Sequence, residues 1–180
     1  MIYVLTRFYR LMDKKILIIV PTTSLVEQMA TDFVDYGWSM KQIHRIYSGH
    51  DRETHKPVVI STWQSLYKLP KKFFKDYGVV FGDEAHLFKA KSLTNIMEKL
   101  TDCPYRFGFT GTLDGTQTHR LVLEGLFSKA EKVITTKELM DKNTLAKLNV
   151  VCLLLKHKEE ESKSIKDSNY IEEIQYLISN

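Results

Sequence analysis

The sequence predicts an α/β fold with a mainly parallel sheet. Short segments that are apolar throughout recur along the chain, which is typical of strands covered on both faces. Amphipathic segments with helical spacing lie between them. This alternation indicates a layered domain in which helices cover a sheet, and a length of 180 residues suits about one such domain.

The expected strands each run into turn-forming or polar residues. In chain order they cover residues 15–20, 57–61, 78–82, 106–110 and 149–155. Ligands of open α/β sheets bind at the carboxyl ends of the strands. The residues that follow each strand are therefore the first candidates for a functional site.

The clearest expected helix covers residues 24–36, because its apolar residues recur at helical spacing between Ser24, which is suited to the N-cap, and Gly37. Further helices are expected over residues 91–100, 116–126 and 170–178. Residues 1–12 also have helical spacing, but no cap or strand precedes them. We therefore expect this first helix to be cut part-way.

Composition excludes several classes of protein. The chain has 26 Lys and Arg against 22 Asp and Glu, and this net charge of +4 assists binding to a polyanion without requiring it. Apolar runs such as Ile16–Val20 are far shorter than a membrane span, so we expect a cytoplasmic protein with no membrane anchor. Cys103 and Cys152 lie far apart and outside any CxxC pattern, so we expect reduced, buried thiols.

The most informative segment is VVFGDEAH, in which an apolar strand ends in Asp83 and Glu84. Two adjacent carboxylates at a strand end allow one acid to hold a hydrated Mg²⁺ while the other polarises a water for attack on a phosphoryl group. The alternative is that both are solvated carboxylates at the start of the next helix.

Hydroxyl and amide side chains follow three other expected strands. The three groups are Pro21, Thr22 and Thr23; Thr62, Trp63 and Gln64; and Thr110, Gly111 and Thr112, in which the threonines supply hydroxyls and Gln64 an amide. Such groups are able to hold the phosphates of a nucleic-acid backbone. Each has a plainer alternative: a helix start for the first group, core packing for Trp63, and an ordinary turn for the third.

A basic and aromatic cluster follows the second of these turns. It consists of Lys68, Lys71, Lys72 and Lys75 with Phe73, Phe74 and Tyr77. The cluster fits either a helix that flanks a bound nucleic-acid strand or a solvated face over buried aromatic residues.

Four of these segments resemble, in their order along the chain, motifs of superfamily-two helicases. PTTSLVEQ, TWQSL, GDEAH and FTGTL are similar to motifs Ia, Ic, II and III. The resemblance extends over nearly the whole chain and is closest to the UvsW-type recombination and repair helicases of T-even phages. It implies a RecA-like three-layer domain, the use of ATP and Mg²⁺, and a cytoplasmic location, which is the host cell cytoplasm if a phage encodes the protein.

The resemblance also implies a role for each matching residue. Asp83 would bind Mg²⁺ through water, Glu84 would be the general base, and His86 would couple the nucleotide site to a facing domain. Thr110, Gly111 and Thr112 would couple hydrolysis to the grip on nucleic acid. The groups at Pro21, Thr22 and Thr23 and at Thr62, Trp63 and Gln64 would contact the sugar-phosphate backbone of DNA, or of RNA.

The sequence lacks the phosphate loop that such an enzyme needs, since no Gly-Lys-Ser or Gly-Lys-Thr is present. We expect residues 1–155 to form a partial first RecA-like domain without its phosphate-loop strand, which would leave a gap in the sheet. Residues 156–180 would be a charged linker and the start of the connection to a second RecA-like domain. The missing phosphate-loop segment and the second RecA-like domain are therefore expected partners of this chain.

We therefore expect this chain to be part of an ATP-dependent DNA helicase or translocase that remodels branched DNA. By itself, the chain is expected to be inactive. Two alternatives remain open. One is a nucleic-acid-binding or interaction module without catalysis, and the other is the motor part of a restriction enzyme, which shares the same motifs.

Overall fold

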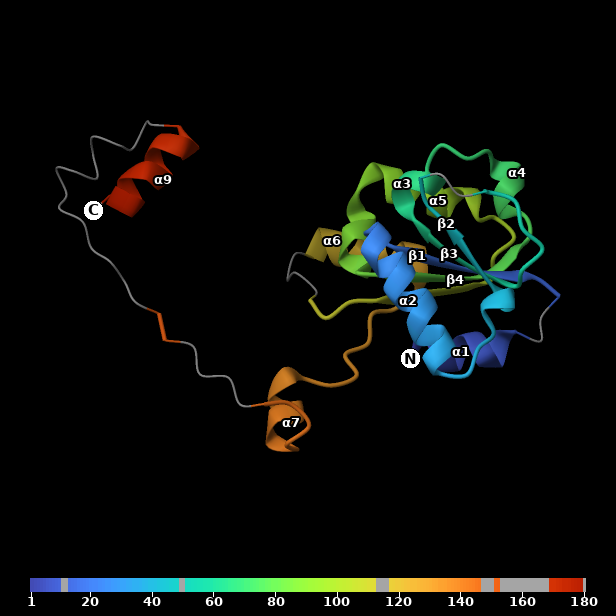
Figure 1. The fold of residues 1–180 in the computed structure, drawn as a ribbon, viewed down its shortest axis with the longest axis horizontal. Coiled ribbons are helices and arrows are strands. Elements are labelled where there is room, and N and C mark those ends of the chain that lie inside the picture. Colours follow the sequence, from blue (N-terminus) through green and yellow to red (C-terminus); the bar gives the residue numbers. More distant parts are fainter. Residues whose placement is uncertain (11–12, 49–50, 113–116, 147–150, 153–168, 180) are drawn as a thin grey trace. The chain divides into compact units, whose positions relative to one another are not determined.

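The computed structural model describes residues 1–10, 13–48, 51–112, 117–146, 151–152 and 169–179 (Figure 1). These residues belong to two compact units, Met1–Glu131 and Lys132–Asn180. The first unit contains the sheet. Of the second unit, the structure describes α7 (Thr136–Asp141) and α9 (Tyr170–Ser179). The domain boundary expected after residue 155 stays a prediction.

The first unit is built on a parallel sheet with the strand order β2-β3-β1-β4-β5. Its strands are β1 (Lys15–Val20), β2 (Ile43–Ile46), β3 (Val58–Thr62), β4 (Tyr77–Asp83) and β5 (Tyr105–Phe109). Every pairing among the described strands is parallel, so the predicted α/β class is confirmed. Four expected strands lie within one residue of their predicted bounds.

One strand was missed, and one strand prediction was wrong. β2 was not expected, because His44 and Arg45 interrupt its short apolar pattern and are only half-buried. In the strand expected over residues 149–155, Val151 and Cys152 are exposed and belong to no strand, while the other residues lie outside the described part of the chain.

Helices cover both faces of the sheet, which gives the three layers that the sequence predicted (Figure 1). α1 (Ile2–Tyr9) and α2 (Thr23–Asp35) pack on one face, around a core that includes Phe33 and Phe81. On the other face lie α3 (Trp63–Leu66), α4 (Lys71–Phe74), the 3₁₀ helix η2 (Ala85–Lys89), α5 (Lys91–Lys99) and α6 (Gln117–Phe127). A further 3₁₀ helix, η1 (Met40–Gln42), precedes β2.

The sheet formed by the described strands is continuous. β1 pairs directly with β3 and β4, and β4 pairs with β5, so the gap expected between strands is absent and that prediction was wrong. That prediction followed from the resemblance, which places the phosphate-loop strand inside the sheet. Because both sides of β1, β3 and β4 are paired, a further strand can add only at an edge of the described sheet. The edges of the described sheet are β2 and β5, and Tyr105 at the start of β5 is 39% exposed.

Two glycines on neighbouring strands make room for aromatic rings. Gly82 of β4 and Gly108 of β5 are register partners. A Cβ on Gly82 would lie 2.8 Å from Phe88 Cζ and 2.9 Å from Phe127 Cζ, and a Cβ on Gly108 would lie 3.1 Å from Phe127 Cγ. The pair therefore lets η2 and the end of α6 pack directly on the strands that carry the candidate acids.

The start of α2 also differs in detail from the prediction. Thr22, not Ser24, is the N-cap, and its Oγ1 accepts a hydrogen bond from the Leu25 N–H at 3.3 Å. Ser24 already lies within the helix. The cap fixes the direction in which the chain leaves β1.

The two cysteines differ in exposure. Cys103 is buried as expected, but Cys152 is exposed, so the prediction of two buried thiols was wrong for Cys152. Among the described residues, no helix has both the length and the apolar character needed to cross a membrane.

This difference predicts selective alkylation. Burial raises the pKa of the Cys103 thiol to about 11, so almost none of it is thiolate at pH 8, whereas Cys152 is accessible to reagent. Iodoacetamide at pH 8 is therefore expected to modify Cys152 alone in the folded chain and both cysteines in urea, as read by peptide mass spectrometry. Equal modification of Cys103 in the folded chain would contradict the burial.

Candidate functional site

The candidate acids lie where β4 ends. Asp83 is the last residue of β4, and Glu84 follows it with φ 49° and ψ 52°, in the left-handed region. This conformation costs a residue other than glycine roughly 1–2 kcal/mol. Backbone strain of this kind is concentrated at functional sites, and here it turns the chain sharply from the strand into η2.

His86 connects the end of β4 to the turn after β5. Its Nδ1 lies 3.3 Å from Glu84 Oε2 and 2.9 Å from Thr110 Oγ1. Thr110 Oγ1 donates to the Thr112 carbonyl oxygen at 2.8 Å and accepts from the Thr112 N–H at 3.2 Å. The structure thus brings together Glu84, His86, Thr110 and Thr112, which the sequence placed in two separate motifs.

The contact with Glu84 favours one tautomer of His86. A carboxylate only accepts hydrogen bonds, so Nδ1 is suited to donate here, and Thr110 Oγ1 is able to accept from the same N–H. His86 Nδ1 therefore carries a proton and also faces the Glu84 carboxylate. This arrangement holds the Glu84 side chain toward β5. Gly111, the third predicted residue of this turn, is exposed, and a Cβ added there would meet open space.

Asp83 is half-buried and fits the acid part of a magnesium–nucleotide site. Mg²⁺ keeps several waters and is usually bound by one or two carboxylates together with substrate phosphates. The described residues contain no cluster of three or more His, Cys, Asp or Glu able to hold a metal by themselves. Asp83 with Glu84 beside it therefore suits a Mg²⁺ ion whose other ligands are waters and the phosphates of a nucleotide.

The two candidate nucleic-acid turns lie side by side, because β1 and β3 are neighbours with Val20 opposite Thr62. Gln64 Nε2 reaches the Pro21 carbonyl oxygen at 3.5 Å and bridges the turns. Thr22, Thr23 and Gln64 are exposed. Thr62 is only 4% exposed, and its Oγ1 lies 3.0 Å from Ser65 Oγ, so its hydroxyl is directed into the first turn of α3.

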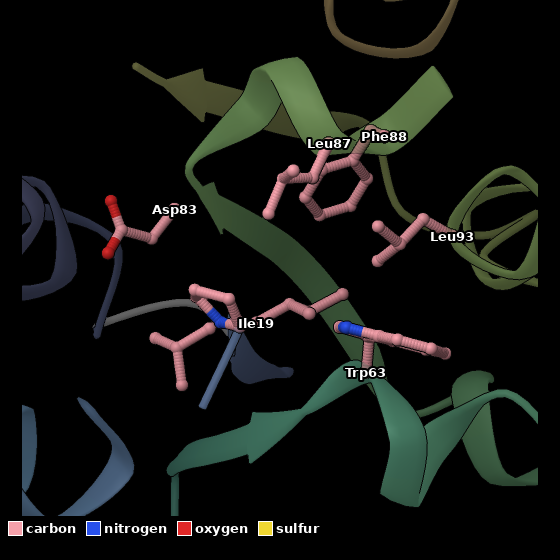
Figure 2. A pocket seen from close by; sticks show the side chains of 8 residues that line it. Ile19, Trp63, Asp83, Leu87, Phe88 and Leu93 are labelled. Atoms are coloured by element: carbon pink, nitrogen blue, oxygen red, sulfur yellow. The ribbon is translucent and has the colours of Figure 1, made fainter. Parts of the chain in front are cut away.

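Trp63 lies between the two kinds of site. It is half-buried and packs against the core under α3 and α5. Figure 2 shows it beside an apolar hollow, with the Asp83 carboxylate pointing away from the apolar side chains. The hollow is lined by Ile19, Val20, Pro21, Trp63, Asp83, Leu87, Phe88 and Leu93. Trp63 therefore packs against the core, as its plainer alternative expected. This packing joins the two candidate nucleic-acid turns to η2.

A group that the sequence did not reveal joins α2 to β2. Glu27 of α2 accepts hydrogen bonds from the Arg45 guanidinium and from the Tyr47 hydroxyl, which lie in β2 and directly after it. The bond to Glu27 raises the pKa of Tyr47. No pattern pointed to this cluster, because β2 itself was not expected.

All candidate residues therefore lie along one edge of the sheet. Across the strand order, β3 and β1 carry the hydroxyl and amide turns, β4 carries the acids, and β5 carries the turn that holds His86. A ligand held by β3 and β1 would be one strand away from a ligand held by Asp83. The arrangement can bind two ligands and connect them through packed side chains.

Comparison with known proteins assigns this arrangement to a family. Residues 1–115 match the family model described as "Type III restriction enzyme, res subunit". The chain is 36% identical over 170 residues to the ATP-dependent DNA helicase uvsW of Enterobacteria phage T4, an alignment that covers 92% of this chain and 34% of that protein. The chain thus spans about a third of the length of this relative.

Solved structures agree with the assignment. The crystal structure of the UvsW helicase from bacteriophage T4 is 40% identical with a TM-score of 0.64, covering 71% of this chain and 47% of that one. The helicase domain of Hef from Pyrococcus furiosus has the same fold, with a TM-score of 0.61 at 19% identity over 72% of this chain and 31% of that one. The chain belongs to the family of the type III restriction enzyme res subunit and, within it, is a superfamily-two helicase sequence of the UvsW type.

Proposed function

We propose that this chain forms part of the first motor domain of an ATP-dependent DNA helicase or translocase. One observation carries the proposal: the acids, the histidine turn and the backbone-binding turns lie on adjacent strands at one edge of the sheet. Hydrolysis and grip on a strand must be coupled in such a motor, and this edge connects them.

At the acid end, Mg-ATP would supply the phosphoryl group that is attacked when it is bound. Asp83 would hold the hydrated cation through its carboxylate. Glu84 orients the attacking water and accepts its proton. His86 positions Glu84 through the contact at 3.3 Å and connects it to the turn after β5 through its contact with Thr110.

The phosphate-binding half of the nucleotide site must come from residues outside these 180, because the sequence contains no Gly-Lys-Ser or Gly-Lys-Thr. Among the described strands, both sides of β4 are already paired, with β1 and with β5. A further strand that brings a phosphate loop beside Asp83 would therefore add to the open edge of β5. A second RecA-like domain would close the cleft with an arginine.

From this follows a prediction about the chain alone. Without the phosphate loop and an arginine across the cleft, turnover falls by about 10³-fold or more. The purified 180-residue chain is therefore expected to release phosphate from ATP at background rate, in a coupled assay with and without DNA. Turnover at helicase rates that disappears on Glu84→Gln would contradict this prediction and show that the chain is a complete ATPase by itself.

The nucleic-acid partner is proposed to be single-stranded or branched DNA, gripped by its backbone in recombination and repair within the host cytoplasm. Exposed hydroxyl and amide groups at Thr22, Thr23 and Gln64 recognise phosphates and sugars, which carry no sequence information. This suits a protein that moves along any sequence, and RNA offers similar groups.

Binding of DNA by the chain itself tests this part of the proposal. Fluorescence anisotropy with a labelled oligothymidine of about 16 nucleotides is expected to show binding at low salt, weakened by Gln64→Ala about fivefold, as for the loss of one hydrogen bond. Asn95→Ala on α5 removes another exposed amide and is expected to leave the affinity unchanged. No binding at low salt, or equal effects of both variants, would contradict the turns as the grip.

The alternative without catalysis rests on one observation, the absence of a phosphate loop from the sequence. A binding module would bind DNA through the same turns and would never hydrolyse ATP, even when joined to the missing segments. Turnover by such a joined protein therefore separates the two functions.

A further inference from the structure

Four exposed lysines follow the Gln64 turn. Lys68, Lys71, Lys72 and Lys75, defined here as the lysine surface, are all exposed. The sequence contains no Asp or Glu from residue 54 to residue 75, so no acid within this segment offsets their charge. A run of lysines this dense produces a local positive potential.

The other described cations near this surface are used within the protein. Lys15 pairs with Asp76, and the Lys99 ammonium donates to the carbonyl oxygens of Tyr67 and Leu69. In the part of the chain that the structure describes, no lysine of the lysine surface forms an ion pair. The Lys68 ammonium lies 5.4 Å from the centroid of the Tyr67 ring. These charges are therefore available to a partner.

The backbone places the first lysine of this surface next to the proposed grip. α3 begins at Trp63, and helical geometry continues through Tyr67, with φ −60° and ψ −28°. Trp63 and Tyr67 form the inner row of the helix, with ring centroids 6.0 Å apart. Gln64 and Lys68 have the same spacing on the exposed side, so Lys68 lies one turn, about 6 Å, beyond Gln64.

α4 follows after Pro70 and, with its C-cap Lys75, carries the other three lysines along the same face of the sheet. Its inner side is anchored by Phe74, which is 1% exposed in the core, and by half-buried Phe73. Lys71 and Lys75 are spaced four residues apart and are both exposed. Packing of Phe73 and Phe74 explains why α4 lies against the sheet. This packing does not explain why the exposed side chains of α4 are all lysines.

We propose that the lysine surface binds the sugar-phosphate backbone of the DNA strand where it continues beyond Gln64. The inference rests on the proposed function, since it extends the grip of the Gln64 turn by two or three phosphates. Lysine contacts phosphate as a point charge, so the contribution is independent of sequence and depends strongly on salt.

The test is the salt dependence of oligothymidine binding by the folded chain. The triple variant Lys68→Gln, Lys71→Gln and Lys75→Gln is expected to bind at least tenfold more weakly at low salt. The slope of log K against log salt should fall by about 2, since each phosphate contact contributes about 0.7 for single strands. Lys68→Gln alone should lower the slope by about 0.7.

A matched control removes the same charge elsewhere. Arg7→Gln and Arg10→Gln alter α1 on the opposite face, and Lys41→Gln alters η1; all three residues are exposed. This triple variant is expected to keep the slope of the unmodified chain. Equal losses in both triple variants would show a general charge effect and overturn the inference.

The remaining outcomes separate this inference from the function on which it rests. Loss of affinity in Gln64→Ala with no effect of the lysine variants overturns the inference and leaves the proposed grip intact. A chain that binds no DNA overturns both. If polyglutamate competes as strongly as DNA for the unmodified chain, the surface recognises acidic protein, and the inference is likewise wrong.

Discussion

Glu84→Gln is expected to lower ATP turnover by about 10²- to 10⁴-fold, the range that general-base catalysis contributes. The change is best made in a chimera in which this chain replaces the matching segment of the phage T4 helicase, to which it is 36% identical over 170 residues. The T4 protein then supplies the rest of the motor. Phosphate release in the presence of single-stranded DNA is the measurement.

The expected loss has a specific physical cause. Glutamine keeps the size of the side chain and its contact with the proton on His86 Nδ1, but its amide cannot accept the proton of an attacking water. Glu98→Gln on α5 is the matched control, because Glu98 is exposed and lies outside the site. Turnover that survives Glu84→Gln, or falls equally with Glu98→Gln, would exclude Glu84 as the base.

Gly82→Ala is expected to destabilise the fold by about 1–3 kcal/mol, the usual cost of overpacking a core. The added Cβ would lie 2.8 Å from Phe88 Cζ and 2.9 Å from Phe127 Cζ, and both rings are held in the packing on β4 and β5. Because Gly82 precedes Asp83, the same shift would also move the candidate acids. Urea unfolding followed by circular dichroism measures the change.

Gly125→Ala is the opposite case and serves as its control. Gly125 lies inside α6, and nothing is within 4 Å of the position that a Cβ would occupy. Alanine there should raise the free energy of unfolding by about 0.5–1 kcal/mol, because it lowers the entropy lost on forming the helix. Two variants with the same effect would mean that Phe88 and Phe127 do not pack as described.

Much of the fold was predictable because its strong signals are local. β1 and β4 are apolar throughout, and the helical spacing in α2 and α5 is regular. β2 was missed because its burial is created by tertiary contacts and not by its own composition. The expected sheet gap failed for a related reason, since strand order depends on packing between distant segments.

The candidate site was predictable as a set of residues but not as a network. Asp83 and Glu84 were visible as acids after an apolar strand, and their motif order suggested a role. No sequence pattern revealed that His86 contacts Thr110 or that Gln64 reaches the Pro21 carbonyl oxygen. These contacts arise because strands distant in sequence become neighbours, so they required the structure.

The central claim is that one sheet edge joins the grip on DNA to ATP hydrolysis, through contacts such as Gln64 with Pro21 and His86 with Thr110. The most direct test is the rate of ATP hydrolysis by the chimera as single-stranded DNA is added. We expect DNA to stimulate turnover, and Gln64→Ala to shift the DNA concentration needed for half of this stimulation about fivefold upward. Hydrolysis that is independent of DNA, or a Gln64→Ala chimera that responds to DNA like the unmodified one, would contradict the account.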